Sequence, residues 1–221
     1  MNDQEYVALY HQLTEKAIHN VFKRFSGNSK LILTESDLKC WLFRELMHEI
    51  EQGEKPSLSV HTEVTHYPRN EGNKSKYFMR DLTILDSQNL KMNEELWEKR
   101  VNGDHTLSKG FKHNGPAMHF ELKLIRQGQH ESSMLKIDSS DIENLNNVNP
   151  EKRAYTIVWV SKNDNCNLGF LEEQLKKSFE TFKNTKLAEN DLLRFYLMDQ
   201  KCYKIYKLDF ENNLPKISAF N

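Results

Sequence analysis

The amino-acid sequence predicts an α/β fold in which helices flank a mixed β-sheet. In its N-terminal part, apolar side chains recur at the three- and four-residue steps that are typical of amphipathic helices. From residue 59 onward, β-branched and apolar residues alternate with polar ones, which indicates strands. Residues 155–160 are continuously apolar, as expected for a central strand that is covered on both faces.

Two helices are predicted before the first strand. The first covers residues 3–25, where the apolar positions follow the helical period. The second opens at Thr34, whose side chain can cap the helix, with Asp37 three residues later as in a capping box. It is expected to stop near Gly53, and the first helix is an addition to the core that follows.

Strands follow from alternation or from continuous apolarity, and they are expected at 59–65, 77–85, 117–125 and 155–160, with two more within 193–208 around a turn at Asp199 and Gln200. Helical periodicity returns at 139–148 and at 169–182. The clearest strand is 117–125, where apolar side chains face one way and His119, Glu121 and Lys123 face the other.

One polar connection is unusually long. Residues 87–116 join two predicted strands, and this length exceeds the ~12–15 residues that are usual for structureless loops. Part of it, 93–101, is expected to be helical. We therefore predict a single domain over residues 1–221 with a functional insertion at about 87–116.

Composition excludes several classes of protein. The net charge of -1 gives no whole-chain signal for a polyanionic partner, so any nucleic-acid surface must be local. The three cysteines are far apart, which favours a reducing cytosol over a disulfide framework. No apolar run approaches the ~18 residues of a membrane span, so we expect a cytoplasmic protein without a membrane partner. Zinc spacings, phosphate-binding glycine loops and nucleophile elbows are not found in the sequence.

The informative pattern is a carboxylate in one strand and a Glu-x-Lys in the next. Asp81 lies in the second predicted strand, and Glu121 and Lys123 lie on one face of the third. Charges in such strands require partners, a metal or solvent. A Mg²⁺ ion shared by Asp81 and Glu121 would relieve their mutual repulsion, with Mn²⁺ as an alternative. Lys123 could then orient the attacking water or stabilise charge on a phosphate.

With Arg80-Asp81 followed by Glu121-Leu122-Lys123, the sequence resembles the PD-(D/E)XK nuclease superfamily, which has the restriction-endonuclease-like fold. The resemblance covers roughly residues 34–160 and implies a three-layer core and Mg²⁺-dependent cleavage of nucleic-acid phosphodiesters. It further implies that Asp81 and Glu121 bind the metal, that Lys123 serves the nucleophilic water, and that Glu35 completes the site. Arg80 replaces the usual proline, and the 40-residue interval from Asp81 to Glu121 is long.

Two further acids are candidates for the same site. Glu45 falls on the buried arc of the second helix, whereas Glu35 lies at its edge. Glu63, with His61, lies on the first predicted strand and could act as a ligand or a base. The alternative interpretation of these strand residues, and of Glu121 and Lys123, is a solvated face of an antiparallel sheet.

A nucleic-acid surface is expected near the site, with DNA favoured over RNA. Residues 66–126 contain 11 Lys and Arg against 8 Asp and Glu. The cations expected to contact phosphates are Arg80, Arg100, Lys109 and Lys112. Cutting both strands of a duplex would favour a symmetric homodimer. The competing hypothesis is a catalytically inactive module that binds nucleic acid or protein on the same fold.

Overall fold

The computed structural model describes a subset of the chain, namely residues 3–53, 57–66, 78–92, 111–113, 115–126, 153–162, 173, 193–211 and 214–220. Its elements in chain order are α1 (Asp3–Gly27), α2 (Glu35–Gln52), β1 (Leu58–His66), β2 (Phe78–Asp86), the 3₁₀ turn η1 (Ser87–Asn89), β3 (Leu90–Met92), β4 (Phe111–His113), β5 (Ala117–Ile125), β6 (Arg153–Ser161), β7 (Leu193–Asp199), β8 (Lys204–Glu211) and β9 (Leu214–Phe220).

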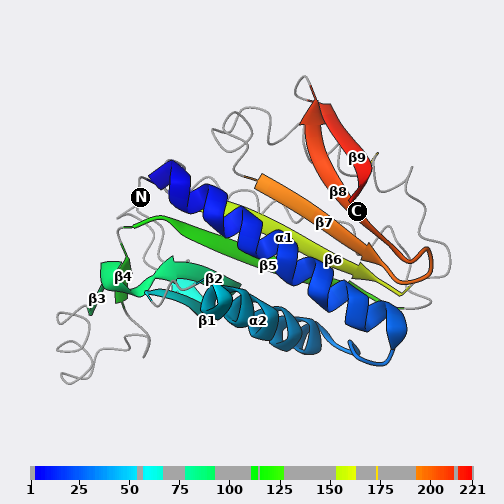
Figure 1. The fold of residues 1–221 in the computed structure, drawn as a ribbon, viewed down its shortest axis with the longest axis horizontal. Coiled ribbons are helices and arrows are strands. Elements are labelled where there is room, and N and C mark those ends of the chain that lie inside the picture. Colours follow the sequence, from blue (N-terminus) through cyan, green and yellow to red (C-terminus); the bar gives the residue numbers. More distant parts are fainter. Residues whose placement is uncertain are drawn as a thin grey trace.

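Seven strands form one mixed sheet in the order β1-β2-β5-β6-β7-β8-β9 (Figure 1). The pairs β5–β6 and β6–β7 are parallel, and the other neighbours are antiparallel. The predicted α/β class with a mixed sheet is therefore confirmed. β9 was not predicted from the sequence; it is an edge strand whose second residue is Pro215. Proline removes a ladder donor and weakens the strand signal, and an edge strand tolerates that loss.

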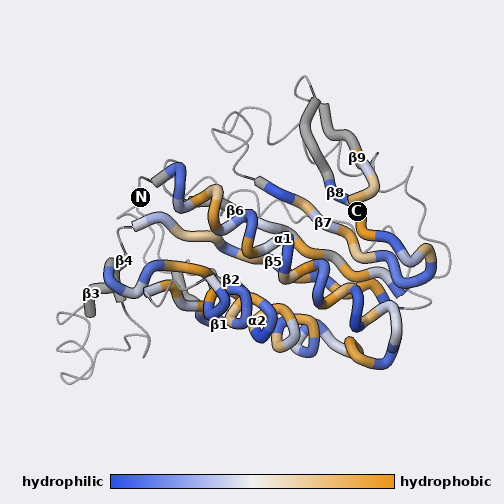
Figure 2. The backbone as a smooth tube through the Cα atoms, in the orientation of Figure 1, coloured by the Kyte–Doolittle hydropathy of each residue, from blue (hydrophilic) through white to orange (hydrophobic). Residues whose placement is uncertain are grey.

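Both helices lie over one face of the sheet (Figure 1). α1 packs on β5, and α2 packs on β1, β2 and β5. The largest side chains fully buried in this layer include Tyr10, Phe25, Phe120 and Tyr196. Removing such a side chain from water contributes about 1.5–3 kcal/mol. Figure 2 shows hydrophobic positions recurring along both helices and the central strands, which explains why the periodicity predicted these elements.

The predicted capping box fixes the start of α2. Thr34 Oγ1 accepts from the Asp37 backbone amide at 3.1 Å, and Asp37 Oδ2 accepts from the Thr34 amide at 2.8 Å. Asp37 Oδ2 also accepts from the Leu33 amide at 2.9 Å. The bonds that the Asp37 carboxylate accepts from the Leu33 amide, the Thr34 hydroxyl and the Thr34 amide, in this order, lower its pKa. The capping box therefore sets the position of Glu35, which follows Thr34 and is the first residue of the helix.

The described parts of the insertion include the turn η1 and the short strands β3 and β4. β3 and β4 pair antiparallel, with Lys91 opposite Lys112, and form a separate two-stranded sheet. The insertion leaves the main sheet at the C-terminal end of β2 and returns at the N-terminal end of β5. The predicted helix at 93–101, with Arg100, and Lys109 lie outside the described residues. So do the predicted helices at 139–148 and 169–182, apart from Glu173.

Among the described residues, neither helix is both long enough and apolar enough to cross a membrane.

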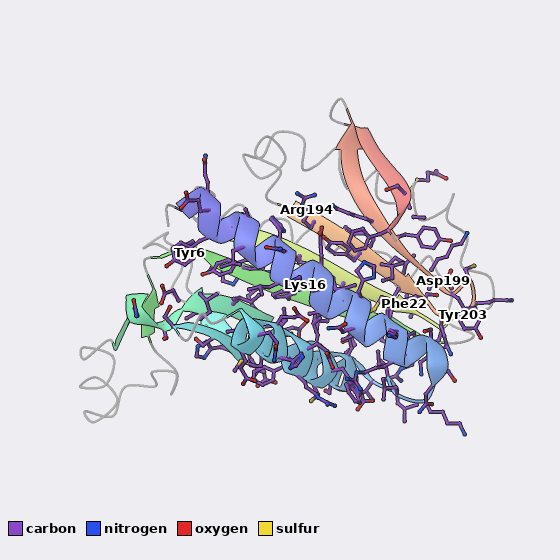
Figure 3. All side chains as sticks on the ribbon, viewed as in Figure 1. Tyr6, Lys16, Phe22, Arg194, Asp199 and Tyr203 are labelled. Atoms are coloured by element: carbon purple, nitrogen blue, oxygen red, sulfur yellow. The ribbon has the colours of Figure 1, made fainter. Side chains whose placement is uncertain are left out.

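A buried histidine lies between α1 and the strands β7 and β8. His11 is 8% exposed, and within the described residues neither ring nitrogen has a hydrogen-bond partner. Burial lowers the pKa of His11 to about 4, and the nearby Arg194 and Lys207 add to this effect, which Glu15 opposes. Figure 3 shows Arg194 at the start of β7.

This pKa makes folding stability depend on pH. Because the unfolded chain binds a proton at His11 near pH 6.5 and the folded chain only near pH 4, stability should fall as the pH falls between these values. Lowering the pH from 7 to 5 should reduce the free energy of unfolding by about 2 kcal/mol through His11. Urea unfolding at both pH values should show a smaller reduction of this free energy for His11→Gln than for the wild type. Equal losses would contradict the prediction.

Candidate active site

The candidate site lies where β2 and β5 separate. Their pairing ends at Leu82 opposite Phe120, and beyond this point two side-chain carboxylates replace β2 along the edge of β5. The Leu122 amide donates to Asp81 Oδ2 at 2.9 Å, and the Leu124 amide donates to Glu35 Oε1 at 3.3 Å. Backbone hydrogen bonds thus hold both acids against the same strand.

Glu121 and Lys123 share the opposite face of β5 from the apolar core. Lys123 Nζ lies 2.9 Å from Glu121 Oε1, and the side chains are 35% and 20% exposed. Their neighbour Leu122 is buried at 1%. On the same face, His119 is fully buried and its Nδ1 lies 3.0 Å from Thr83 Oγ1. This face is therefore half-buried and polar, rather than a freely solvated strand face.

The Asp81 carboxylate lies against the backbone next to Glu121. The amide that bonds Asp81 belongs to the peptide unit joining Glu121 to Leu122. Asp81 and Glu35, two acids selected from the sequence, are thus held along the strand that carries Glu121 and Lys123.

A second lysine, Lys39, lies at the same edge and was not predicted from the sequence. Lys39 Nζ lies 3.3 Å from Asp81 Oδ1 and 3.4 Å from Glu63 Oε1. Burial lowers the pKa of Lys39, but the two carboxylates raise it more, so the ammonium stays charged. A signal was present in the sequence: Glu35 and Lys39 are four residues apart and so share one face of α2.

Glu63 reaches the site through Lys39. Its neighbours in β1, Thr62 and Val64, lie opposite Leu82 and Arg80 of β2. Glu63 is therefore beside Asp81, the residue between those two. Its φ of 53° lies in the left-handed region, which is uncommon for residues other than glycine and costs roughly 1–3 kcal/mol. Backbone strain of this kind is concentrated at functional sites. Nearby, His61 Nε2 lies 2.9 Å from Ser59 Oγ, and burial lowers the pKa of His61.

Two predicted residues are not brought to this edge. Glu45 is 3% exposed and its Oε1 lies 3.1 Å from Arg24 Nε of α1. It follows Glu35 by ten residues, about 15 Å along the helix axis. Arg80 is 3% exposed, so its guanidinium is not presented to a phosphate at the surface. We therefore leave both residues out of the site.

A separate cleft of about 550 Å³ lies between α1 and α2, lined by Asn20, Lys23, Arg24, Arg44, Glu45 and His48. The guanidiniums of Arg24 and Arg44 lie 5.7 and 5.1 Å from the centre of the Trp41 ring. Arg44 is nine residues after Glu35, which places it about half a turn around α2 from the acids at the β5 edge. The cleft therefore belongs to the α1 side of the helix.

The donor set at the β5 edge suits a hard divalent cation. Within the described ranges, no three His, Cys, Asp or Glu side chains gather into a metal site of their own. Mg²⁺ usually takes only one or two protein carboxylates and fills its shell with water and substrate phosphate. Asp81 and Glu121 supply such oxygens, and both already have an ammonium group as neighbour. The oxygen chemistry of these two side chains suits Mg²⁺, which would have to share them with the two lysines.

Comparison with known proteins gives no family. No family model matches the sequence, and no curated protein matches it. One solved structure, the crystal structure of the central domain of yeast acetyl-CoA carboxylase, has 8% sequence identity and a TM-score of 0.33, covering 79% of this chain and 25% of that chain. This chain thus spans about a quarter of that protein, and a likeness this low carries no argument. The function must therefore be inferred from the site itself.

Proposed function

We propose that the protein is a Mg²⁺-dependent nuclease with a restriction-endonuclease-like core. One observation carries the proposal: Glu35 and Asp81 are bonded to alternate amides of β5, the strand that also bears Glu121 and Lys123. Three acids and a lysine from three elements, α2, β2 and β5, are thereby directed to one sheet edge. Structural ion pairs alone do not require this convergence, whereas metal-assisted phosphodiester hydrolysis does.

The arrangement of elements supports the same proposal. In chain order, α2, β1, β2, β5 and β6 correspond to the helix, strand, Asp strand, Glu-x-Lys strand and apolar strand that support the resemblance. The helix expected between the last two, at 139–148, lies outside the described residues. The pairing is antiparallel, antiparallel and parallel along this order. Glu121 and Lys123 lie in the C-terminal half of β5, beside the parallel strand β6. Open α/β sheets commonly bind ligands at the carboxyl ends of parallel strands.

Each residue has a role that follows from its contacts. Asp81 and Glu121 would hold Mg²⁺, or Mn²⁺, which neutralises phosphate charge and makes water more acidic when bound. Lys123, oriented by Glu121 at 2.9 Å, would donate a hydrogen bond to the attacking water and direct it through its ammonium group. Glu35 fixes the end of β5 through the Leu124 amide and so positions Glu121 and Lys123.

Cations at the same end of the sheet favour a polyanionic substrate. The Lys162 amide bonds the Ile125 carbonyl at 3.0 Å, which places Lys162 beside the end of β5. Burial lowers the pKa of Lys162, and Asp37 partly offsets this effect. The Lys162 ammonium lies 5.8 Å from the centre of the Phe25 ring, so the ammonium groups paired with the acids at the edge are those of Lys39 and Lys123. Nucleic acid, with DNA favoured, is the proposed substrate, because its phosphates are the natural partners of such a cluster of cations.

A specific observation favours a second candidate. Lys39 and Lys123 pair with Asp81 and Glu121, so these acids have counter-charges without a metal. A non-catalytic module that binds nucleic acid or protein would need nothing more. The two candidates differ in whether a divalent cation changes the covalent state of a bound nucleic acid.

Incubation with supercoiled plasmid, single-stranded DNA and RNA, each with Mg²⁺ or with EDTA, tests the proposal. We expect cleavage of DNA that requires Mg²⁺ and stops in EDTA. Glu45→Gln serves as a matched control, because Glu45 is paired with Arg24 and should leave cleavage unchanged. Binding of these nucleic acids without cleavage in Mg²⁺ or Mn²⁺ would support the non-catalytic module instead.

A separate prediction concerns the insertion, which rejoins the main sheet at Ala117, the first residue of β5. Ala117 lies six residues before Lys123, about 20 Å along β5, which is the length of about six base pairs of B-form duplex. If the insertion grips substrate, Lys109→Ala combined with Lys112→Ala should weaken binding of all sequences equally. The slope of log affinity against log salt should flatten by up to about one for each phosphate that the variant no longer neutralises, with kcat nearly unchanged. An unchanged affinity and slope would exclude the insertion from substrate binding.

A further inference from the structure

We propose that Lys39 is a resident cation of this site, which competes with the single divalent cation for Asp81 and is retained beside it by Glu63. The inference rests on the proposed function, because it concerns the metal at the same carboxylates. It makes Glu63 a positioning residue for Lys39 rather than a metal ligand.

The contacts of Asp81 show why the ammonium and a metal compete. Asp81 Oδ2 accepts the Leu122 amide at 2.9 Å, and Oδ1 lies 3.3 Å from Lys39 Nζ. Both oxygens therefore have a positively polarised neighbour. A divalent cation that binds Asp81 must share or replace the ammonium at Oδ1. The Lys39 side chain is only 18% exposed, so it cannot withdraw freely into solvent.

Glu63 gives Lys39 a second partner. Its Oε1 lies 3.4 Å from Lys39 Nζ, and its side chain is 53% exposed. When Asp81 turns to a metal ion, the ammonium retains this contact and stays at the edge of the site. The left-handed backbone of Glu63, with φ of 53°, is part of what places the carboxylate there. In this interpretation, the strained backbone of Glu63 serves to hold the Lys39 ammonium and takes no part in the reaction.

The charges leave room for a divalent cation beside Lys39. The carboxylates of Glu63, Asp81 and Glu121 outnumber the two ammonium groups paired with them, those of Lys39 and Lys123. This excess of negative charge favours binding of a divalent cation while Lys39 stays in place.

Isothermal titration of the full chain with MgCl₂ tests the competition. We expect one Mg²⁺ per chain for the wild type and about tenfold tighter binding for Lys39→Met, since the substitution removes a positive charge within a few ångströms of Asp81. Lys39→Arg, which keeps the charge, should bind like the wild type. Lys207→Met is the matched control, because Lys207 pairs with Glu15 of α1 at 3.2 Å, and its effect should stay within about threefold.

A double-mutant cycle tests the role of Glu63. Glu63→Gln should weaken Mg²⁺ binding in the wild type, because Lys39 then pairs with Asp81 alone, and should have a clearly smaller effect in the Lys39→Met background. A loss of the same size in both backgrounds would mean that Glu63 acts on the metal without Lys39, through its own charge or as a ligand, and would overturn its positioning role. Affinity unchanged by Lys39→Met would overturn the competition while leaving the proposed nuclease function in place. A wild type and variants that all fail to bind Mg²⁺ or Mn²⁺ would overturn the proposed function, and the inference with it.

Discussion

Asp81→Asn and Glu121→Gln should each reduce Mg²⁺-dependent cleavage of DNA by on the order of 10³-fold or more. Each substitution keeps the shape of the side chain and removes the negative charge that the metal requires. In the Asp81→Asn variant, the Leu122 amide can still donate to the carbonyl oxygen of the new side chain, so the strand edge should keep its geometry. Single-turnover cleavage with saturating DNA measures this loss directly.

The stability of the two variants separates a lost site from a lost fold. From the sequence, the two acids repel each other, and their neutral variants should melt no lower than the wild type without metal. The structure changes this expectation, because Lys39 and Lys123 already neutralise the acids. Partly exposed ion pairs of this kind contribute about 0–1 kcal/mol, so the melting temperature should fall slightly or not at all. Full activity in both variants would remove Asp81 and Glu121 from the mechanism.

Lys123→Met should lower kcat by about 10²–10⁴-fold while Mg²⁺ still binds. The substitution keeps most of the apolar stem of the side chain and removes the ammonium that Glu121 orients at 2.9 Å. Because one positive charge beside Glu121 disappears, Mg²⁺ affinity should stay equal or rise. Cleavage rates and Mg²⁺ titration on the same preparation measure the two effects independently.

A matched lysine provides the control for this result. Lys207 pairs with Glu15 of α1 at 3.2 Å, away from the β5 edge, so Lys207→Met should leave both kcat and Mg²⁺ affinity unchanged. If Lys123→Met cleaves like the wild type, the lysine does not act on the water. If it instead loses Mg²⁺ binding together with cleavage, its role is to shape the metal site, and the assignment to chemistry fails.

Local patterns explain which parts of the fold could be predicted. The bounds predicted for 117–125 match β5, because apolar and polar residues alternate over most of the segment, although burial alternates only around Glu121 and Lys123. The capping box of α2 was also predictable, since Thr34 and Asp37 are three residues apart. By contrast, the separation of β2 from β5 beyond Leu82 depends on pairing between distant segments. Sequence periodicity carries no information about where such a pairing ends.

The same distinction applies to the site. Asp81, Glu121 and Lys123 were selected because charges interrupt apolar strands. Lys39 was not, because its partner Glu63 is 24 residues away and the contact requires α2 to lie on β1. The buried position of Glu45 was predicted correctly from its arc on the helix. Its partner is Arg24 of α1, and only the packing of two helices reveals that this carboxylate serves an ion pair.

The most direct test of the account is the location of a bound metal. Crystals grown with Mn²⁺ and measured near the manganese absorption edge locate the ion by its anomalous scattering. We predict one Mn²⁺ ion per chain, in contact with the carboxylates of Asp81 and Glu121 and lost in the Asp81→Asn/Glu121→Gln double variant. Crystals of wild-type protein that show no Mn²⁺ at this edge, or show it bound only at other residues, would contradict the account.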